Sequence, residues 1–147
     1  MLSGINPALT ADILHALASM GHGDELVICD ANFPATSIAA HTVMGAHIES
    51  GVDAISMLDA VLSVVPIDQF DLEICPVRSM QVVDAPDEVP EIVAEAKSLT
   101  IPKGSDIDSV ERHAFYQQAR EAFVIIRTSE TRFYGNFILR KGTVSSS

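Results

Sequence analysis

The residue in this sequence best suited to move a proton is a histidine between two glycines. His22 lies in the segment Met20-Gly-His-Gly-Asp-Glu25, between a predicted helix and a predicted strand. The glycines leave the imidazole with little side-chain cover and let a ligand or another backbone come close. An imidazole titrates near neutral pH, so it can both give and take a proton. On its own this pattern is compatible with a catalytic or a structural histidine.

A second polar segment, Asp30-Ala-Asn-Phe-Pro34, follows the apolar run Leu26–Cys29. Ligand sites in open α/β sheets favour the carboxyl ends of the strands. Asp30 and Asn32 carry groups that bind sugar hydroxyls, although an Asx-turn or a helix cap explains them equally well. Because His22 and Asp30 bracket one strand, we expect them at its opposite ends. A site that uses both residues then needs the loop to fold back or a neighbouring subunit to contribute.

The third group of candidates lies near the C-terminus. Arg112 falls in the first turn of a predicted helix, where the helix dipole disfavours a cation, so we expect a specific partner to hold it. Tyr134, Gly135 and Asn136 place a phenol, a bare backbone and an amide in a row beside a predicted strand. This combination suits an edge that binds a polyol, and a simple β-turn is the alternative.

Other kinds of chemistry have no support in the sequence. The nucleotide-binding glycine motifs, GxSxG and HExxH are missing. The histidines His41, His47 and His113 match no metal-ligand spacing, and Cys29 and Cys75 form no disulfide framework. A formal charge of −11 argues against nucleic-acid or anionic-membrane partners, which require clustered Lys and Arg. We therefore expect no metal and no cofactor, which leaves acid/base chemistry or simple binding.

Helical and strand-like patterns alternate along the chain. They predict helices over 10–20, 53–65, 86–99 and 108–122, and strands over 26–29, 77–83, 123–126 and 137–139. The last of these helices is predicted from the capping-box spacing of Asp108 and Glu111. With 147 residues, 48% of them hydrophobic, we expect one α/β domain over residues 1–147, with helices covering a central sheet. The N-terminus lacks the features of a signal peptide and no apolar run is long enough to span a bilayer, so we expect a cytoplasmic protein.

Taken together, these segments resemble the RbsD/FucU family, which contains the fucose mutarotases and the ribose pyranases. The resemblance is carried, in the order and spacing of the family, by Met20–Glu25, Asp30–Ala35, Arg112-His-Ala-Phe-Tyr116 with Ala119, and Tyr134-Gly-Asn-Phe-Ile-Leu139 with Lys141-Gly142. The glycine after His22, the Ala-Phe-Tyr segment and the Tyr-Gly-Asn turn are more similar to the fucose branch.

The resemblance implies a single three-layer α/β/α domain that converts the anomers of a free monosaccharide, L-fucose or a related sugar, without metal or cofactor. It implies His22 as the proton donor. It implies substrate binding by Asp30, Arg112, Tyr134, Gly135 and Asn136. It also implies ring-shaped homo-oligomers, commonly decamers, with sites completed across subunit contacts. The alternatives are a pyranose–furanose interconversion of the ribose pyranase type, a monosaccharide-binding protein without turnover, and a structural oligomer.

Overall fold

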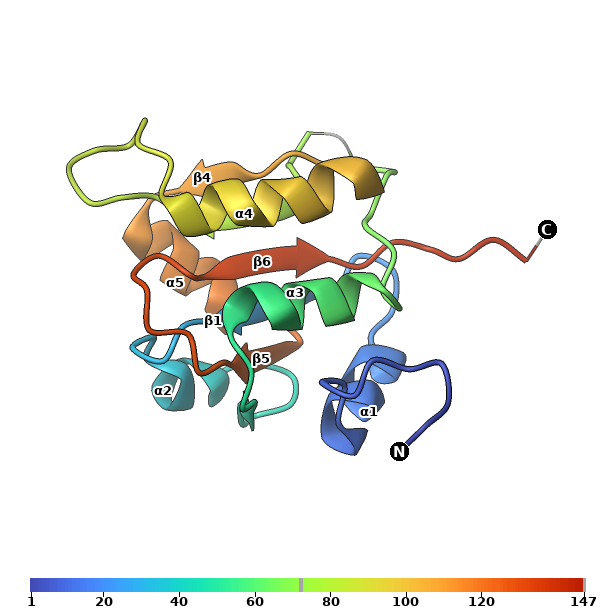
Figure 1. Cartoon of the computed structure of the whole chain (residues 1–147). Coiled ribbons are helices and arrows are strands. Elements are labelled where there is room, and N and C mark those ends of the chain that lie inside the picture. Colours follow the sequence, from blue (N-terminus) through green and yellow to red (C-terminus); the bar gives the residue numbers. More distant parts are fainter. Residues whose placement is uncertain (72, 147) are drawn as a thin grey trace.

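A six-stranded mixed sheet organises the computed structural model, which describes residues 1–71 and 73–146 (Figure 1). The strand order is β2-β5-β1-β6-β3-β4. The strands are β1 (Glu25–Cys29), β2 (Ile48–Glu49), β3 (Val77–Met80), β4 (Asp108–Val110), β5 (Val124–Arg127) and β6 (Phe137–Arg140). Three neighbouring pairs are parallel, whereas β6 runs antiparallel to both β1 and β3.

Helices cover both faces of this sheet, which confirms the predicted three-layer α/β/α arrangement. One face carries α1 (Ala11–Ser19), α3 (Ala54–Leu62) and α4 (Glu91–Thr100), the last followed by the short 3₁₀ helix η1 (Ile101–Lys103). The other face carries α2 (Ala35–Ala39) and α5 (Arg112–Arg120).

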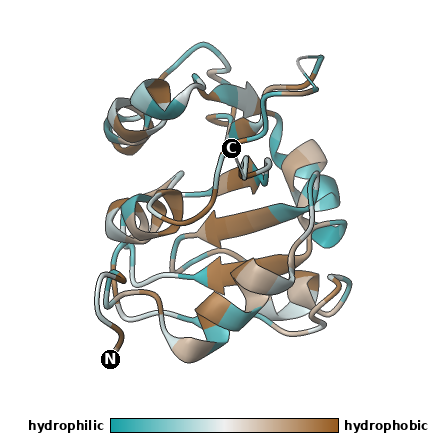
Figure 2. Ribbon diagram, turned by 90° about the vertical axis from the view of Figure 1, so that its right-hand side faces the viewer, coloured by the Kyte–Doolittle hydropathy of each residue, from teal (hydrophilic) through white to brown (hydrophobic). Residues whose placement is uncertain are grey.

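The central strand β1 supplies both hydrophobic layers. Leu26 and Ile28 pack into the cluster under α1, α3 and α4, whereas Val27 and Cys29 pack into the cluster under α2 and α5. This division follows from the two-residue period of a strand, which sends successive side chains to opposite faces. Figure 2 shows the central strands as the most hydrophobic part of the ribbon. A continuous apolar run is therefore the expected sequence for β1.

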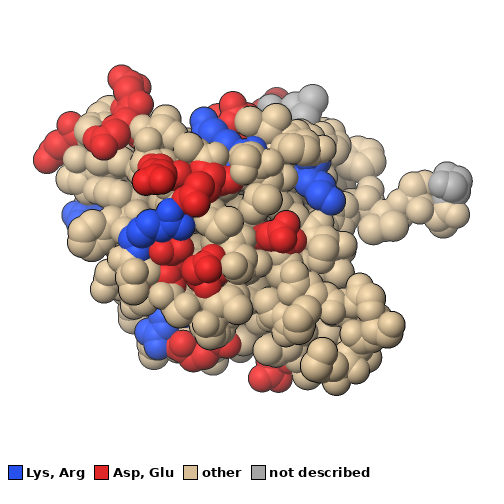
Figure 3. All heavy atoms as spheres, in the orientation of Figure 1, with Lys and Arg blue, Asp and Glu red and all other residues tan. Residues whose placement is uncertain are grey.

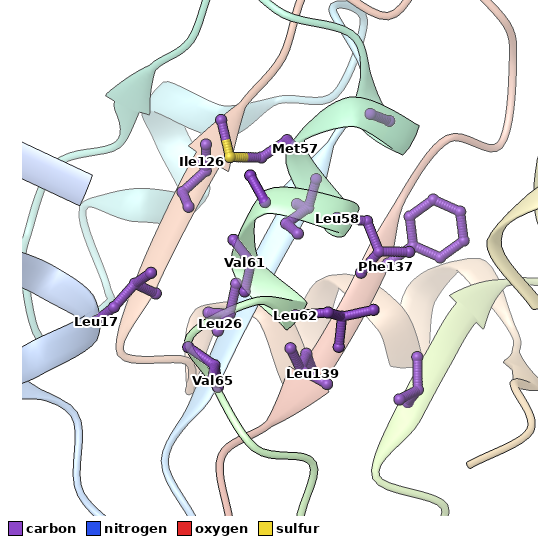
Figure 4. Close-up of a cluster of buried hydrophobic side chains, with 14 of the residues drawn as sticks. Leu17, Leu26, Met57, Leu58, Val61, Leu62, Val65, Ile126, Phe137 and Leu139 are labelled. Carbon is purple, nitrogen blue, oxygen red and sulfur yellow. The ribbon is translucent and has the colours of Figure 1, made fainter. Parts of the chain in front are cut away.

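Helix α3 makes the main contact on its face of the sheet. Its buried residues Met57, Leu58 and Val61 lie over side chains of β1, β5 and β6 (Figure 4). The helix begins at a true cap, because the Asp53 carboxylate accepts the Ser56 N–H at 2.7 Å. The predicted start of this helix is therefore confirmed, although its last residue is Leu62 rather than Val65.

The helix predicted over 108–122 is wrong in its first part. Asp108–Val110 forms β4 and pairs in parallel with Arg78–Met80 of β3. The cap is Glu111, whose carboxylate accepts the Ala114 N–H at 3.0 Å, so the helix starts at Arg112. Strand pairing, a long-range contact, outweighs the local capping-box pattern.

The remaining elements differ from prediction mainly at their ends. Thr10 caps α1 as predicted, and β1, β5 and β6 lie within a residue or two of their predicted bounds. Strand β3 stops at Met80 rather than 83, and α4 starts at Glu91, just after Pro90, rather than at 86. Helix α2 and strand β2 were not predicted. Both are short, and too few residues carry their periodicity.

The acidic charge is distributed over the surface. On the face shown in Figure 3, acidic and basic side chains are interspersed. Arg132 pairs with Glu95 of α4, and Lys97 lies 3.3 Å from Asp106. Over the part of the chain that the structure describes, every helix is too short or too polar to cross a membrane.

Replacing Leu58 by Ala tests the contact between α3 and the sheet. Leu58 is fully buried, so the substitution removes apolar contacts and leaves a cavity. We expect the free energy of unfolding to fall by about 3 kcal/mol, measured by urea denaturation at fixed protein concentration. The matched control is Val89→Ala at a half-exposed position, which should change it by less than about 0.5 kcal/mol. Equal losses in the two variants would contradict this view of the core.

Candidate functional site

Asp30 and Asn136 meet at one edge of the sheet although they are 106 positions apart in the sequence. Asp30 directly follows β1 and Asn136 directly precedes β6, and the antiparallel register pairs Ile28 with Phe137. The Asp30 N–H donates to Asn136 Oδ1 at 2.9 Å, and Asn136 Nδ2 donates to Asp30 Oδ2 at 3.2 Å. Both residues are buried, so this reciprocal pair is held rigidly.

The Asp30 carboxyl binds protons more readily than an ordinary aspartate. Burial raises its pKa, and this effect outweighs the hydrogen bonds from the backbone of Asn32, Phe33 and Gly135 and from Asn136, which favour the ionised form. The Asn32 N–H donates to Asp30 Oδ1 at 3.0 Å. A buried carboxylate in this setting is a strong acceptor for a hydroxyl group of a ligand.

These groups form one side of a hollow with a volume of about 320 Å³. The hollow combines carboxylate, amide and phenol groups with apolar side chains, and it is lined by Asp30, Asn32, Phe33, Met80, Tyr116, Phe133, Tyr134 and Asn136. A few convergent polar groups among aromatic and apolar walls are typical of a small-molecule site, and the volume is at the lower end of the usual range. The composition suits a molecule with hydroxyl groups and one apolar face, such as a monosaccharide.

Tyr134 and Gly135 shape this hollow through their backbone. Tyr134 has a φ of 66°, which is unusual for a residue with a side chain, and its hydroxyl accepts the Val83 N–H at 3.1 Å. The hydroxyl proton of Tyr134 is thus left to donate to a ligand. A Cβ atom on Gly135 would lie 2.9 Å from Ile92 Cδ1 and 3.0 Å from Glu130 Cγ, so only glycine fits there without displacing its neighbours.

Arg112 lies outside this hollow. It is exposed at the first position of α5 and lines a neighbouring depression together with Gln81, Val82, Val83, Asp84, Glu111 and His113. The two hollows approach each other at Val83, whose N–H is bound by Tyr134. The structure therefore gathers Asp30, Tyr134, Gly135 and Asn136 in one place and puts Arg112 beside them.

His22 lies at the opposite end of β1. It precedes Glu25, the first residue of the strand, whereas Asp30 follows Cys29, the last. A five-residue strand with a rise of about 3.3 Å per residue separates the two ends by roughly 16 Å. One chain therefore does not bring the His22 imidazole to the hollow that contains its own Asp30.

The His22 imidazole is held by a buried aspartate. His22 Nε2 lies 3.1 Å from Asp68 Oδ1, and Arg140 Nε donates to Asp68 Oδ2 at 2.7 Å. An ionised carboxylate only accepts hydrogen bonds, so Nε2 must carry the proton of this contact. Nδ1 is then the nitrogen that can exchange a proton with a ligand. The side chain of His22 is 45% exposed, so a ligand has access to it.

Asp68 remains ionised despite its burial. Burial alone opposes ionisation, but the Phe70 N–H, His22 and Arg140 stabilise the negative charge more strongly and lower the pKa of Asp68 to about 2. Arg140 is fixed in turn, because its guanidinium donates to the carbonyl groups of Asp71 and Ile74 at 2.7 and 2.9 Å. The result is a hydrogen-bonded chain, Arg140–Asp68–His22, that holds the imidazole while 45% of the His22 side chain stays exposed.

Sequence reasoning found His22 but missed Asp68, Arg140 and Phe70. The signal for Arg140 is an arginine that directly continues the apolar strand Phe137–Leu139, where a charge needs a buried partner. Asp68 follows a helix and a proline and has no distinguishing local pattern. In the described ranges 1–71 and 73–146, no three His, Cys, Asp or Glu side chains are grouped closely enough to bind a metal ion.

The folded-state pKa of Asp68 predicts an acid-sensitive contribution to stability. The pKa of Asp68 is about 2 in the folded protein, below the ordinary value of 3.8. Its contribution to stability is therefore fully present above pH 3.8 and is lost as the pH falls toward about 2. We expect the wild type to lose more unfolding free energy between pH 5 and pH 2 than Asp68→Asn does, as measured by urea denaturation. Parallel pH profiles would contradict the assignment. A carbon-13 NMR titration of the wild-type carboxyl checks the same pKa without a variant.

Comparison with known proteins identifies the family. The sequence matches the RbsD / FucU transport protein family over residues 3–144. It is 36% identical to the fucose mutarotase of Danio rerio, over 98% of this chain and 95% of that protein. It is 38% identical to the L-fucose mutarotase of Actinobacillus pleuropneumoniae, over 97% of this chain and 96% of that protein.

A solved structure agrees with this result. The fucose mutarotase of Streptococcus pneumoniae, crystallised in complex with L-fucose, superimposes with a TM-score of 0.85 at 33% sequence identity and covers 98% of this chain and 100% of that one. The agreement extends over nearly the whole of this chain and all of that one. The chain therefore belongs to the RbsD/FucU family.

Proposed function

We propose that this protein is a cofactor-free isomerase that interconverts the α and β anomers of a free monosaccharide, L-fucose or a close relative. The observation that carries the proposal is the half-exposed His22, which is tied through Nε2 to a buried ionised Asp68 and keeps Nδ1 free. Two relatives over almost the full length of the chain are named fucose mutarotase, which supports the same activity.

The reaction needs one proton delivered and one removed. Opening the hemiacetal ring requires a proton on the ring oxygen while the anomeric hydroxyl loses its proton, and closure on the other face of the aldehyde reverses both transfers. In our proposal the protonated His22 donates from Nδ1 to the ring oxygen. The anomeric proton passes to a base or to water. Asp68 stabilises the imidazolium and fixes its orientation, so the imidazole is in place before the sugar binds.

The hollow at the other end of the sheet is proposed to bind the sugar. Asp30 accepts hydrogen bonds from hydroxyl groups of the sugar, and the Asn136 amide exchanges hydrogen bonds with them. Tyr134 donates its free hydroxyl proton, and Gly135 lets the backbone lie close to the sugar. Arg112 is proposed to reach the sugar from the neighbouring depression. All of these groups act by positioning the substrate, which supplies much of the rate enhancement in such reactions.

We infer that each complete site uses two subunits of a homo-oligomeric ring. The support is geometric, since roughly 16 Å of strand separates His22 from Asp30 in one chain, whereas mutarotation needs proton donor and bound sugar in contact. Head-to-tail contacts, in which His22 of one subunit approaches the hollow of the next, close into a ring where the rotation between neighbouring subunits closes. A neighbouring subunit is one of the two arrangements expected from the sequence, the other being a loop that folds back.

Replacing His22 by Ala tests the proton donor. We expect anomer exchange of L-fucose, followed by saturation-transfer NMR between the α and β signals, to fall by about 10²- to 10⁴-fold because general acid catalysis is lost. His15→Ala, which removes an exposed histidine of α1, is the matched control and should retain full activity. Undiminished exchange in the His22 variant would refute the proposal. A panel with ribose, galactose and rhamnose separates this activity from a ribose pyranase activity and from binding without turnover.

Mixing two inactive variants tests the shared site. A His22→Ala subunit keeps an intact hollow and an Asp30→Asn subunit keeps an intact histidine. If sites form between subunits, random mixing in equal amounts restores about a quarter of the wild-type exchange rate, since half of the hollows and half of the histidines are intact. Each variant mixed with itself is the control. Absence of any recovery in verified mixed oligomers would show that each site lies within one chain.

A further inference from the structure

Phe70 is exposed although it is a large aromatic residue. Its exposed fraction is 72%, whereas Phe115 and Phe137 are at most 1% exposed. Single exposed hydrophobic residues are common in folded proteins and carry no meaning by themselves. Phe70 differs from such residues in how it is attached to the candidate proton donor.

The same carboxylate oxygen holds Phe70 and His22. The Phe70 N–H donates to Asp68 Oδ1 at 3.0 Å, and His22 Nε2 lies 3.1 Å from the same atom. The two rings touch edge to face, with centroids 5.2 Å apart and an interplanar angle of 63°. Arg140 binds the carbonyl group of the next residue, Asp71, at 2.7 Å. These bonds hold the backbone of Phe70, and its phenyl ring lies against the imidazole.

This arrangement decides what a ligand of His22 must contact. A general acid needs its proton within about 3 Å of the atom that receives it. A pyranose ring is about as wide as the separation of the two aromatic rings, so a sugar that reaches the His22 imidazole extends along Phe70. The exposed phenyl ring is therefore available to a sugar that binds at His22.

The chemistry of a pyranose fits such a surface. One face of a galacto-configured pyranose, such as L-fucose, gathers C–H groups of partial positive charge. The face of a phenyl ring is electron-rich and apolar, so it attracts these groups and removes them from water. It also offers no hydrogen-bonding group that could compete with His22 for the ring oxygen.

We propose that Phe70 is a substrate-binding residue whose ring packs against the C–H face of the pyranose while His22 exchanges its proton. The proposal rests on the proposed function, since it takes His22 as the proton donor. In the proposed two-subunit site, Phe70 accompanies His22 to the neighbour's hollow, because the two rings are in contact. The residue therefore contributes to affinity and to the choice of sugars with a continuous C–H face.

Phe70→Ala and Phe70→Trp test this contact. We expect Phe70→Ala to raise KM for L-fucose about tenfold, while kcat falls by no more than about threefold, because stacking is lost but the acid remains. Phe70→Trp restores an aromatic face and should stay within about threefold of wild type. In saturation-transfer difference NMR, the ring C–H signals of L-fucose should lose intensity in the Ala variant alone. Ile101→Ala, another exposed apolar position, is the control.

Three results would overturn the proposal. One is an unchanged KM and difference spectrum in Phe70→Ala. Another is a fall in kcat at unchanged KM in Phe70→Ala, which would make Phe70 a support for the imidazole only. The third is a loss of oligomer in sedimentation that accounts for the whole loss of activity, which would make it an interface residue. A wild type without any exchange activity refutes the proposed function instead, and the binding spectra then still report on Phe70.

Discussion

The antiparallel pairing of β1 with β6 determines where both ends of the candidate site lie. The register that joins Ile28 to Phe137 brings Asp30 and Asn136 together at one edge of the sheet. The same register joins Glu25 to Arg140 and brings Arg140 to the end of the sheet where His22 lies. A shift of one residue would turn every side chain of β6 to the other face and would separate both pairs, so the hydrophobic packing of these strands also fixes the site.

Asp68 has a comparable role at the histidine end. It accepts hydrogen bonds from the Arg140 guanidinium, from His22 Nε2 and from the Phe70 backbone N–H, so one buried carboxylate orients three residues. Burying a carboxylate costs free energy unless its oxygen atoms accept hydrogen bonds, and both oxygen atoms of Asp68 do so here. The stability of this cluster and the orientation of the imidazole thus depend on the same bonds.

The fold was predictable from the sequence where the pattern was local and strong. The apolar run Leu26–Cys29 and the cap of α1 by Thr10 required no knowledge of other segments. Prediction failed where distant residues decide, because Asp108–Val110 becomes a strand only through its pairing with β3. The candidate site shows the same division, since His22 stands out between its glycines, whereas the role of Asp68 depends on an arginine 72 positions away.

The separation of the two half-sites has a physical consequence. A histidine in a short glycine turn with 45% of its side chain exposed does not exclude water by means of its own chain, and the hollow at Asp30 lies at the other end of β1 from that histidine. Joining the two across a subunit contact would cover both, because the groups that remain exposed in one chain, Phe70 and Phe133, lie beside the histidine and at the hollow respectively. In the proposed two-subunit site, their exposure follows from completion of the site by assembly, and the acid and its substrate meet at the subunit contact.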